Sequence, residues 1–298
     1  MTAASETPVW QPIDVDAALA GSRAMGQWLR DMRAHVAAGR DTEAPPAPAA
    51  VDDPAARAAM IEARKPHVET WLNRFSDLGL PLVRVKPFAK KTIDAGWQKT
   101  TQTDWPLIEQ HVTGTGNPGF VLGQDVIGWD ADNALGTAAF KIAGLPLFTV
   151  SAGSQDPDSR HPGGVHVLWR RPACWPKGIT LSCPDNAVRL ANGGLVDVLV
   201  GPHQMVLPLS VVVTSEGDQP FRVGAYLSAS AAGYCDQEQD GWLMADRDGD
   251  LPELPMWAWP DAMLQYAPAG SVRGEVPAGL EALVGTVAEA VEPEPRAP

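Results

Sequence analysis

Apolar residues recur along this chain at helical spacing in four stretches. Steps of three and four residues place an apolar face on residues 24–38 and another on residues 54–77, where Pro54 takes a favoured first-turn position. Shorter helices are expected over about 103–111 and 135–143. The apolar positions of the two longer helices are Met25, Trp28, Leu29, Met32 and Val36 in the first, and Val68, Trp71, Leu72 and Phe75 in the second.

Short apolar runs bounded by Gly, Pro and Asn predict strands in the rest of the chain. Two hairpins are expected, one of 119–123 with 126–129 and one of 188–190 with 195–200. The second would turn at Asn192-Gly193-Gly194, because Asn-Gly favours the tight turns of hairpins. The complete set of expected strands is 80–85, 119–123, 126–129, 147–151, 165–169, 188–190, 195–200 and 205–207.

Polar segments divide the chain into three parts. The stretch 41–54 is rich in Pro, Ala and acid, which is typical of a linker, so residues 1–53 are expected to be an N-terminal amphipathic helix with its tether. Residues 54–266 carry most of the apolar segments and form the expected main domain. The Pro/Glu/Ala-rich residues 267–298 are expected to be a disordered tail, apart from one weak helix near 278–291.

The net charge of −13 argues, taken alone, against a nucleic-acid partner. The acid is concentrated towards the chain ends, because residues 57–222 hold 16 Lys and Arg against 15 Asp and Glu. Residues 236–261 carry eight acids and one arginine, and most of this segment is expected to be an acidic loop. Residues 84–99 hold five basic residues and one acid. A local basic face therefore remains compatible with a phosphate-bearing ligand.

Cysteine usage and hydropathy indicate the compartment. Cys174, Cys183 and Cys235 form no Cys-x-x-Cys pair, and no secretory signal or apolar run of 18 residues occurs. We therefore expect reduced thiols, a cytoplasmic location and no membrane contact. A zinc site of Cys174, Cys183 and a histidine is an open alternative.

The candidate chemistry starts at Asp130 and Asp132, which follow an apolar run beginning at Val126. Residues i and i+2 of a strand point to the same face, so the two carboxylates would project together. Hard oxygen ligands at this spacing suit Mg²⁺ or Mn²⁺. A strand that ends in a solvated Asp-x-Asp turn is the simpler interpretation, and a sugar-nucleotide transferase is a further one.

Several downstream residues add to this pair. His166 follows Gly163 and Gly164, and glycines allow a close backbone approach to a phosphate; the alternative is a hydrogen-bonded structural histidine. Asp197 lies in an expected hairpin strand, where it could equally be an exposed residue. Other candidate phosphate or nucleic-acid contacts are Lys86, Lys90 and Lys91 and, on the polar loop 152–164, Arg160 and His161. Core packing is preferred to base stacking for Trp97 and Trp129.

Taken in order, these segments resemble the bifunctional primase–polymerase (prim-pol) domain of the archaeo-eukaryotic primase superfamily, of the phage and plasmid type. The resemblance covers about residues 68–265 and rests on the order of its motifs. These are Leu78-Gly79-Leu80-Pro81-Leu82, Gly96-Trp97, Asn117-Pro118-Gly119-Phe120-Val121, Asp130-x-Asp132, Gly163-Gly164-x-His166, Val196-Asp197-Val198, Pro208-Leu209-Ser210 and residues 251–257. One departure is the segment 152–162, which separates Ser151 from the two glycines that usually follow it directly.

The resemblance implies an α/β fold of the mixed α+β kind, with an RRM-like sheet and flanking helices. It implies a DNA primase and DNA-directed polymerase that takes dNTP or NTP on a single-stranded DNA template, with two Mg²⁺ or Mn²⁺ ions. Asp130, Asp132 and Asp197 match the family's metal-binding and catalytic carboxylates, and His166 matches its phosphate-contacting histidine. The expected nucleotide-binding residues are His166, Gly163, Gly164, Arg160, Lys90 and Lys91.

The resemblance also suggests a setting, which is DNA replication of a phage or plasmid in the cytoplasm of a bacterial host. No Gly-x-x-x-x-Gly-Lys-Ser/Thr motif occurs, so any helicase would be a separate partner. The rival interpretation is a catalytically inactive, primase-like replication module that binds DNA or a helicase.

Overall fold

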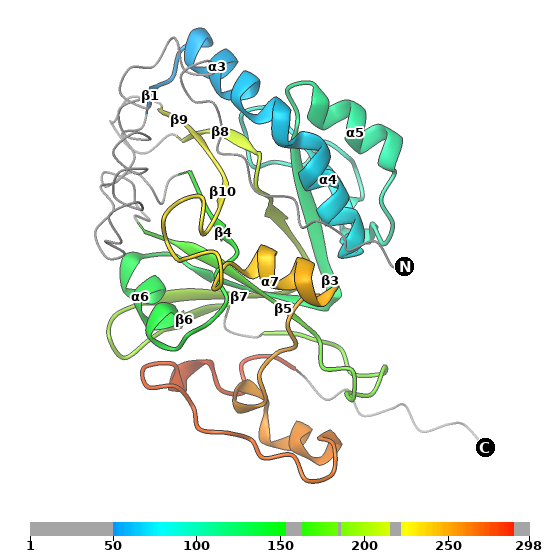
Figure 1. Cartoon of the computed structure of the whole chain (residues 1–298). Coiled ribbons are helices and arrows are strands. Elements are labelled where there is room, and N and C mark those ends of the chain that lie inside the picture. The colour runs from blue at the N-terminus through cyan, green and yellow to red at the C-terminus, as the bar shows by residue number, and fades with distance from the viewer. Residues whose placement is uncertain (1–49, 153–162, 184–185, 215–221, 289–298) are drawn as a thin grey trace, which may run out of the picture.

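The computed structural model describes residues 50–152, 163–183, 186–214 and 222–288 (Figure 1). The helix expected over 24–38, as well as Arg160 and His161, lies outside these residues. The helices are α3 (Pro54–Arg64), η1 (Lys65–His67), α4 (Val68–Asp77), η2 (Trp97–Lys99), α5 (Trp105–Thr113), α6 (Ala134–Ile142), α7 (Gly241–Asp248), η4 (Met256–Ala258), η5 (Asp261–Tyr266) and η6 (Glu281–Leu283). The strands are β1 (Ala50–Val51), β2 (Leu82–Val85), β3 (Asn117–Ala131), β4 (Thr149–Val150), β5 (Val165–Arg170), β6 (Ala187–Arg189), β7 (Leu195–Val206), β8 (Val211–Thr214), β9 (Arg222–Ala225) and β10 (Leu227–Ser228).

A seven-stranded antiparallel sheet forms the centre of the fold. Its strand order is β10-β4-β5-β3-β7-β6, and β2 pairs with β3 as well. Strands β2 and β5 pair with different halves of β3, while β7 pairs with β3 along nearly its whole length. A smaller antiparallel sheet has the order β1-β9-β8. Helices combined with antiparallel sheets confirm the expected mixed α+β class.

The hairpin expected between 119–123 and 126–129 is wrong, because both segments belong to the single strand β3. Gly123 lies inside this strand, next to the exposed residues Gln124 and Asp125. It has a positive φ of 62° and faces Gly201 of β7, which has a φ of 74°. The register between β3 and β7 shifts on both sides of this pair, so the two glycines bend both strands together instead of reversing the chain.

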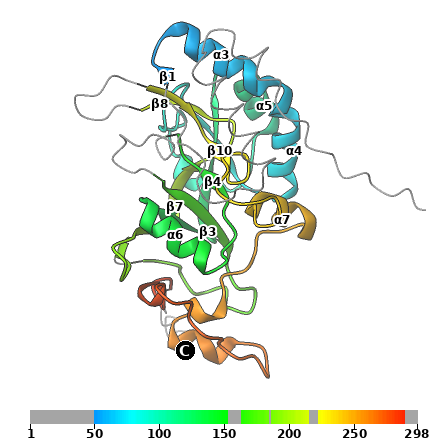
Figure 2. The same cartoon turned by 60° about the vertical axis from the view of Figure 1, so that its left-hand side comes forward.

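The two faces of the large sheet bury separate apolar clusters. On one face, Trp129 and its neighbours pack against Phe140 of α6 and the C-terminal residues around Trp257. On the other face, residues such as Leu168 and Met205 pack against α4, α5 and α7. Figures 1 and 2 show α3, α4 and α5 at one end of the molecule and the C-terminal segment at the other.

The helices expected over 54–77, 103–111 and 135–143 form with local changes. The helix expected over 54–77 is divided into α3 and α4, because Pro66 cannot continue the hydrogen bonding of an α-helix. The expected acidic loop contains α7, whose first turn is capped by the Asp240 carboxylate. Gly249 ends α7 with a positive φ of 72°.

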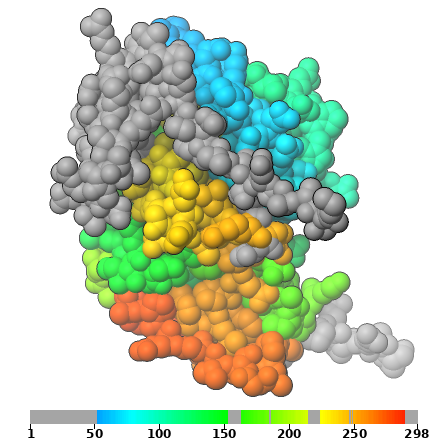
Figure 3. Space-filling view, in the orientation of Figure 1, coloured from blue at the N-terminus to red at the C-terminus, as the bar shows by residue number. Residues whose placement is uncertain are grey.

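The disordered tail expected from residue 267 onwards is wrong for residues 267–288. Leu280, Leu283 and Val287 are at most 1% exposed and belong to the cluster around Trp129. In the described part of the helix expected near 278–291, up to residue 288, only the short η6 forms. Figure 3 shows these orange and red residues packed against the rest of the molecule. Their apolar residues are too sparse to predict a core, but each of these three is buried by tertiary contact.

Candidate active site

Asp130 lies directly between His166 and Asp197 on three adjacent strands. The register of the sheet pairs Asp130 of β3 with His166 of β5 on one side and with Asp197 of β7 on the other. Directly opposed residues of antiparallel strands have Cβ atoms about 4.5–5.5 Å apart and share one face. The Asp130 Oδ1 and His166 Nε2 atoms are 3.4 Å apart. Residues distant in sequence are therefore brought into one row across the sheet.

Asp132 lies two residues beyond Asp130 along the chain, on the same side of the sheet as this row. It follows the last residue of the strand, and its backbone N–H donates a 2.9 Å hydrogen bond to the Leu195 carbonyl. Asn133 then caps α6, since its Oδ1 accepts from the Gly136 N–H at 2.9 Å and from the Leu195 N–H at 3.3 Å. The turn after the carboxylates is thus held to β7. Asn133 was not singled out from sequence, although an Asn before an apolar helical stretch is an N-cap signal.

The intervening residues of β3 face the opposite cluster. The Trp129 ring is fully buried and lies 5.3 Å from the Trp169 ring and 5.8 Å from the Trp257 ring, measured between centroids. Base stacking by Trp129 is therefore excluded in favour of core packing. Because strand residues alternate in direction, this buried indole helps to turn Asp130 and Asp132 to the other side.

Tyr226 and Lys90 extend the row beyond the carboxylates. The Tyr226 side chain is buried, and its ring centroid is 6.2 Å from that of His166. The Lys90 Nζ lies 5.8 Å from the centre of the Tyr226 ring. Burial raises the pKa of Tyr226, and the charge and hydrogen bond of Lys90 oppose that shift. Tyr226 carries no motif that would have identified it, because only the folded chain places it beside His166.

Gly163 and Gly164 have a structural role in this fold. Gly163 has a φ of 80°, and a Cβ there would lie 2.9 Å from the Ala134 Cβ. Its carbonyl accepts a 2.6 Å hydrogen bond from the Thr137 hydroxyl, and Gly164 is buried. Close packing of the start of β5 on α6 therefore explains Gly163 without a phosphate. Lys91 is exposed, and its carbonyl accepts from the Lys86 N–H at 2.8 Å.

The carboxylates form an open set. Within the described residues, no three His, Cys, Asp or Glu side chains are arranged so that they could hold a metal ion by themselves. The zinc alternative with Cys174 and Cys183 thus gains no support. No helix among the described residues is long and apolar enough to cross a membrane.

Comparison with known proteins agrees with the motif order. Residues 72–226, just over half of the 298-residue chain, match the family described as bifunctional DNA primase/polymerase, N-terminal. A search of curated proteins gave no match. The matched segment contains the whole row from Lys90 through Asp130, His166 and Asp197 to Tyr226. The chain therefore belongs to the bifunctional DNA primase/polymerase family, whose general activity is primer synthesis and nucleotidyl transfer.

Proposed function

We propose that this protein is an active, metal-dependent DNA primase/polymerase and that Asp130, Asp132 and Asp197 are its catalytic carboxylates. The observation that carries the proposal is the direct register of Asp130 with His166 and Asp197 on one face of three adjacent strands. Carboxylates and a histidine in one row provide neighbouring sites for cations and for a triphosphate. In the reaction, the primer 3′-oxygen bonds to the α-phosphorus of a nucleotide while the bond to pyrophosphate breaks.

Asp130, Asp132 and Asp197 would hold Mg²⁺ or Mn²⁺. Such ions are commonly bound by one or two carboxylates together with substrate phosphates, so the proposal does not require a complete cage of protein ligands. Two bound ions would stabilise the attacking and leaving oxygens of the in-line displacement. The side chains themselves would fix where those ions lie relative to His166, since all three β-strands belong to one sheet.

His166 would donate a hydrogen bond from its ring to the triphosphate. The ring is held between Asp130 at 3.4 Å and the buried Tyr226, and its side chain is only 10% exposed, so its orientation is restricted. Lys90, beside Tyr226, would add a positive charge to the same region. We also propose Arg160, Lys91 and the Gly163-Gly164 backbone as outer contacts of the nucleotide, although packing on α6 already accounts for Gly163.

The proposed substrates are a single-stranded DNA template and dNTP or NTP, and the proposed setting is phage or plasmid replication with a separate helicase. The rival is an inactive replication module that binds DNA or a helicase. One observation favours it, namely that no described group of three ligands forms a complete metal cage. A measurement of nucleotide incorporation distinguishes the active enzyme from the inactive module.

The test is a primer-synthesis assay with the full chain. Single-stranded DNA, Mg²⁺ or Mn²⁺ and labelled nucleotides should give short products with wild type and none with Asp130→Asn. Gln237→Glu, at an exposed position of the acidic segment, is the control and should leave product yield unchanged. A wild-type protein that is folded and binds DNA but forms no product with either ion would favour the inactive module.

A further inference from the structure

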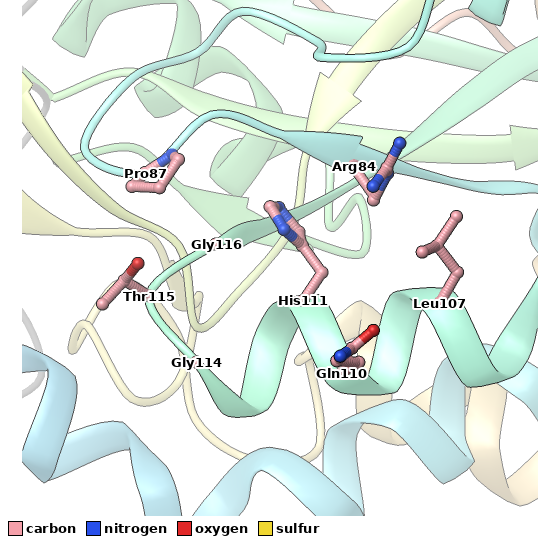
Figure 4. Close-up of a pocket in the computed structure, with 8 residues that line it drawn as sticks. All are labelled: Arg84, Pro87, Leu107, Gln110, His111, Gly114, Thr115 and Gly116. Atoms are coloured by element: carbon pink, nitrogen blue, oxygen red, sulfur yellow. The ribbon is translucent and has the colours of Figure 1, made fainter.

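A second concave site lies at the other end of β3. It is a cavity of about 310 Å³ between α5 and the segment that leaves β2, and Figure 4 shows its lining side chains. Arg84 and Pro87 line it from the β2 side, and Leu107 and His111 line it from α5. This volume lies at the lower end of the range for small-ligand pockets. We call it the α5 cleft.

Two buried polar residues join the walls of the α5 cleft. Arg64 is 5% exposed, and its guanidinium donates to the Asn117 side chain at 3.3 Å. Asn117, which is fully buried, donates in turn to the Lys86 and Ala89 carbonyls at 3.3 and 3.2 Å. On the α5 side, Arg64 donates hydrogen bonds of 2.8–3.0 Å to the carbonyls of Val112, Gly114 and Gly116. The cleft is therefore preformed.

A buried positive charge lies behind the wall of the cleft, because Arg64 donates to the carbonyls of the lining residues Gly114 and Gly116. Burial lowers the pKa of Arg64 to about 10, which leaves the guanidinium charged at neutral pH. The guanidinium donates to four backbone carbonyls and to the Asn117 side-chain oxygen, and none of these acceptors bears a negative charge. A cation buried without an acidic partner raises the local affinity for an anion.

His111 presents an acceptor to the cleft. Its Nε2 is 2.8 Å from the Val85 carbonyl, so Nε2 must carry the proton and Nδ1 is an acceptor in the neutral ring. Burial lowers the pKa of His111, the hydrogen bond to the Val85 carbonyl opposes that shift, and the charges of Arg84 and Arg64 add to it, which favours the neutral ring. Gly116 makes room for the ring, because a Cβ there would lie 2.0 Å from it.

Arg84, which lines the cleft, carries hydrogen-bond donors on its guanidinium. Asp94 accepts from its Nε at 3.1 and 3.2 Å and from Nη2, while Nη1 makes no hydrogen bond among the described residues. Lys86, two residues along, is exposed. Leu107 and Pro87 supply apolar surface against which a base can lie. The negative charges of Asp94 and Asp104 act on Arg84 and raise its pKa.

The segment 86–91 links this cleft to the candidate active site. Pro87 lines the cleft, while Lys90, three residues later, lies over the Tyr226 ring beside His166. A strand of nucleic acid that follows this segment would therefore pass from the cleft to the carboxylates.

We propose that the α5 cleft binds one unpaired nucleotide of a single-stranded polynucleotide, with its phosphate on Arg84 and its base against Leu107 and His111. This deepens the proposed function, on which it rests for the identity of the ligand as the template strand. The same chemistry would also suit a free nucleotide, and the experiment separates the two sources.

The experiment measures binding of a fluorescent oligo(dT) to the full chain by anisotropy, in EDTA and without nucleotides, at several salt concentrations. Arg84→Gln should weaken binding on the order of tenfold and reduce the slope of log K against log salt by about 0.7, the value for one phosphate on a single strand. Asp94→Asn should instead tighten binding several-fold, because it releases Arg84. A merely structural ion pair would make both variants change binding in the same direction, which would overturn the proposal.

A second pair of variants compares a charge added beside the cleft with the same charge added elsewhere on the surface. Gln110→Glu adds a negative charge beside the cleft and should weaken oligo(dT) binding, while Gln265→Glu, an exposed position on η5, should not. Equal effects of the two would overturn the proposal. In a second arm, dTTP replaces oligo(dT); if Arg84→Gln weakens dTTP as much as the oligonucleotide, the cleft is a free-nucleotide site and the strand assignment is wrong. Because no turnover is needed, failure here is distinct from failure of the proposed reaction.

Discussion

Replacing Arg64 by lysine tests whether the geometry of the guanidinium, and not its charge, holds the fold around the α5 cleft. Arg64 makes five hydrogen bonds, four to backbone carbonyls and one to Asn117. An ammonium has three donors on one nitrogen and cannot reproduce the planar fork. At least two of the five bonds must therefore be lost.

The size of the effect follows from which acceptors are orphaned. Val112, Gly116 and Leu209 are buried, so their carbonyls cannot turn to water when the donor is removed, whereas Gly114 is exposed. Each orphaned buried acceptor costs about 1–3 kcal/mol, so we expect the loss of two of them in Arg64→Lys to lower the free energy of unfolding by about 2–6 kcal/mol. For a domain of this size that corresponds to a fall in Tm of roughly 4–24 °C.

Thermal unfolding followed by circular dichroism checks this, with Arg57→Lys as the matched control. The Arg57 side chain is 39% exposed and pairs with Asp52 at the surface, where such a pair contributes at most about 1 kcal/mol. The expected outcome is a large fall in Tm for Arg64→Lys and a shift of at most a few degrees for Arg57→Lys. Equal shifts in Tm would refute the reasoning, since they would show that charge alone matters at position 64.

Four further predictions concern the active site and the core. Asp197→Asn should slow nucleotide addition by roughly a hundredfold or more in primer extension while leaving Tm nearly unchanged. His166→Ala should weaken nucleotide binding about tenfold to a hundredfold and spare Mn²⁺ binding, as calorimetry of both ligands can show; loss of Mn²⁺ binding alone would contradict it. Leu283→Ala should lower the free energy of unfolding by about 2–5 kcal/mol, and Val272→Ala, at an 83% exposed position, by under about 0.5, in denaturant titrations. The pKa of His111 in the folded protein lies below its ordinary 6.5, so protonation of His111 favours the unfolded chain. The contribution of His111 to stability is therefore complete above pH 6.5 and is lost as the pH falls below that value. His111→Gln should reduce the difference in Tm between pH 7.5 and pH 5.5.

The local alternation of apolar and polar residues was sufficient to predict which side chains share a face of the central strands. Alternation along β3 predicts that Asp130 and Asp132 share a face, and the burial of Trp129 on the opposite face agrees with it. The order of the motifs predicted the family and the mixed α+β class. Each of these inferences depends only on residues close together in sequence or on their order.

Long-range pairing could not be predicted in the same way. That His166 and Asp197 flank Asp130 depends on strand register, which is set by packing between distant segments. Tyr226 joins the row only through the short strands β9 and β10. The expected hairpin between 119–123 and 126–129 is wrong because the polar residues between the two apolar runs lie at a bend within β3, where Gly123 has a positive φ.

The bend at Gly123 and Gly201 limits how this protein's sequence can change in length. One inserted or deleted residue between Gly123 and Val126 would act like a frameshift within the strand, because side chains alternate with a period of two. Asp130 would then face the apolar cluster, and the Trp129 indole would take the place of the carboxylate. Tolerated length changes at this bend should therefore come in pairs of residues, or be matched by a compensating change in β7.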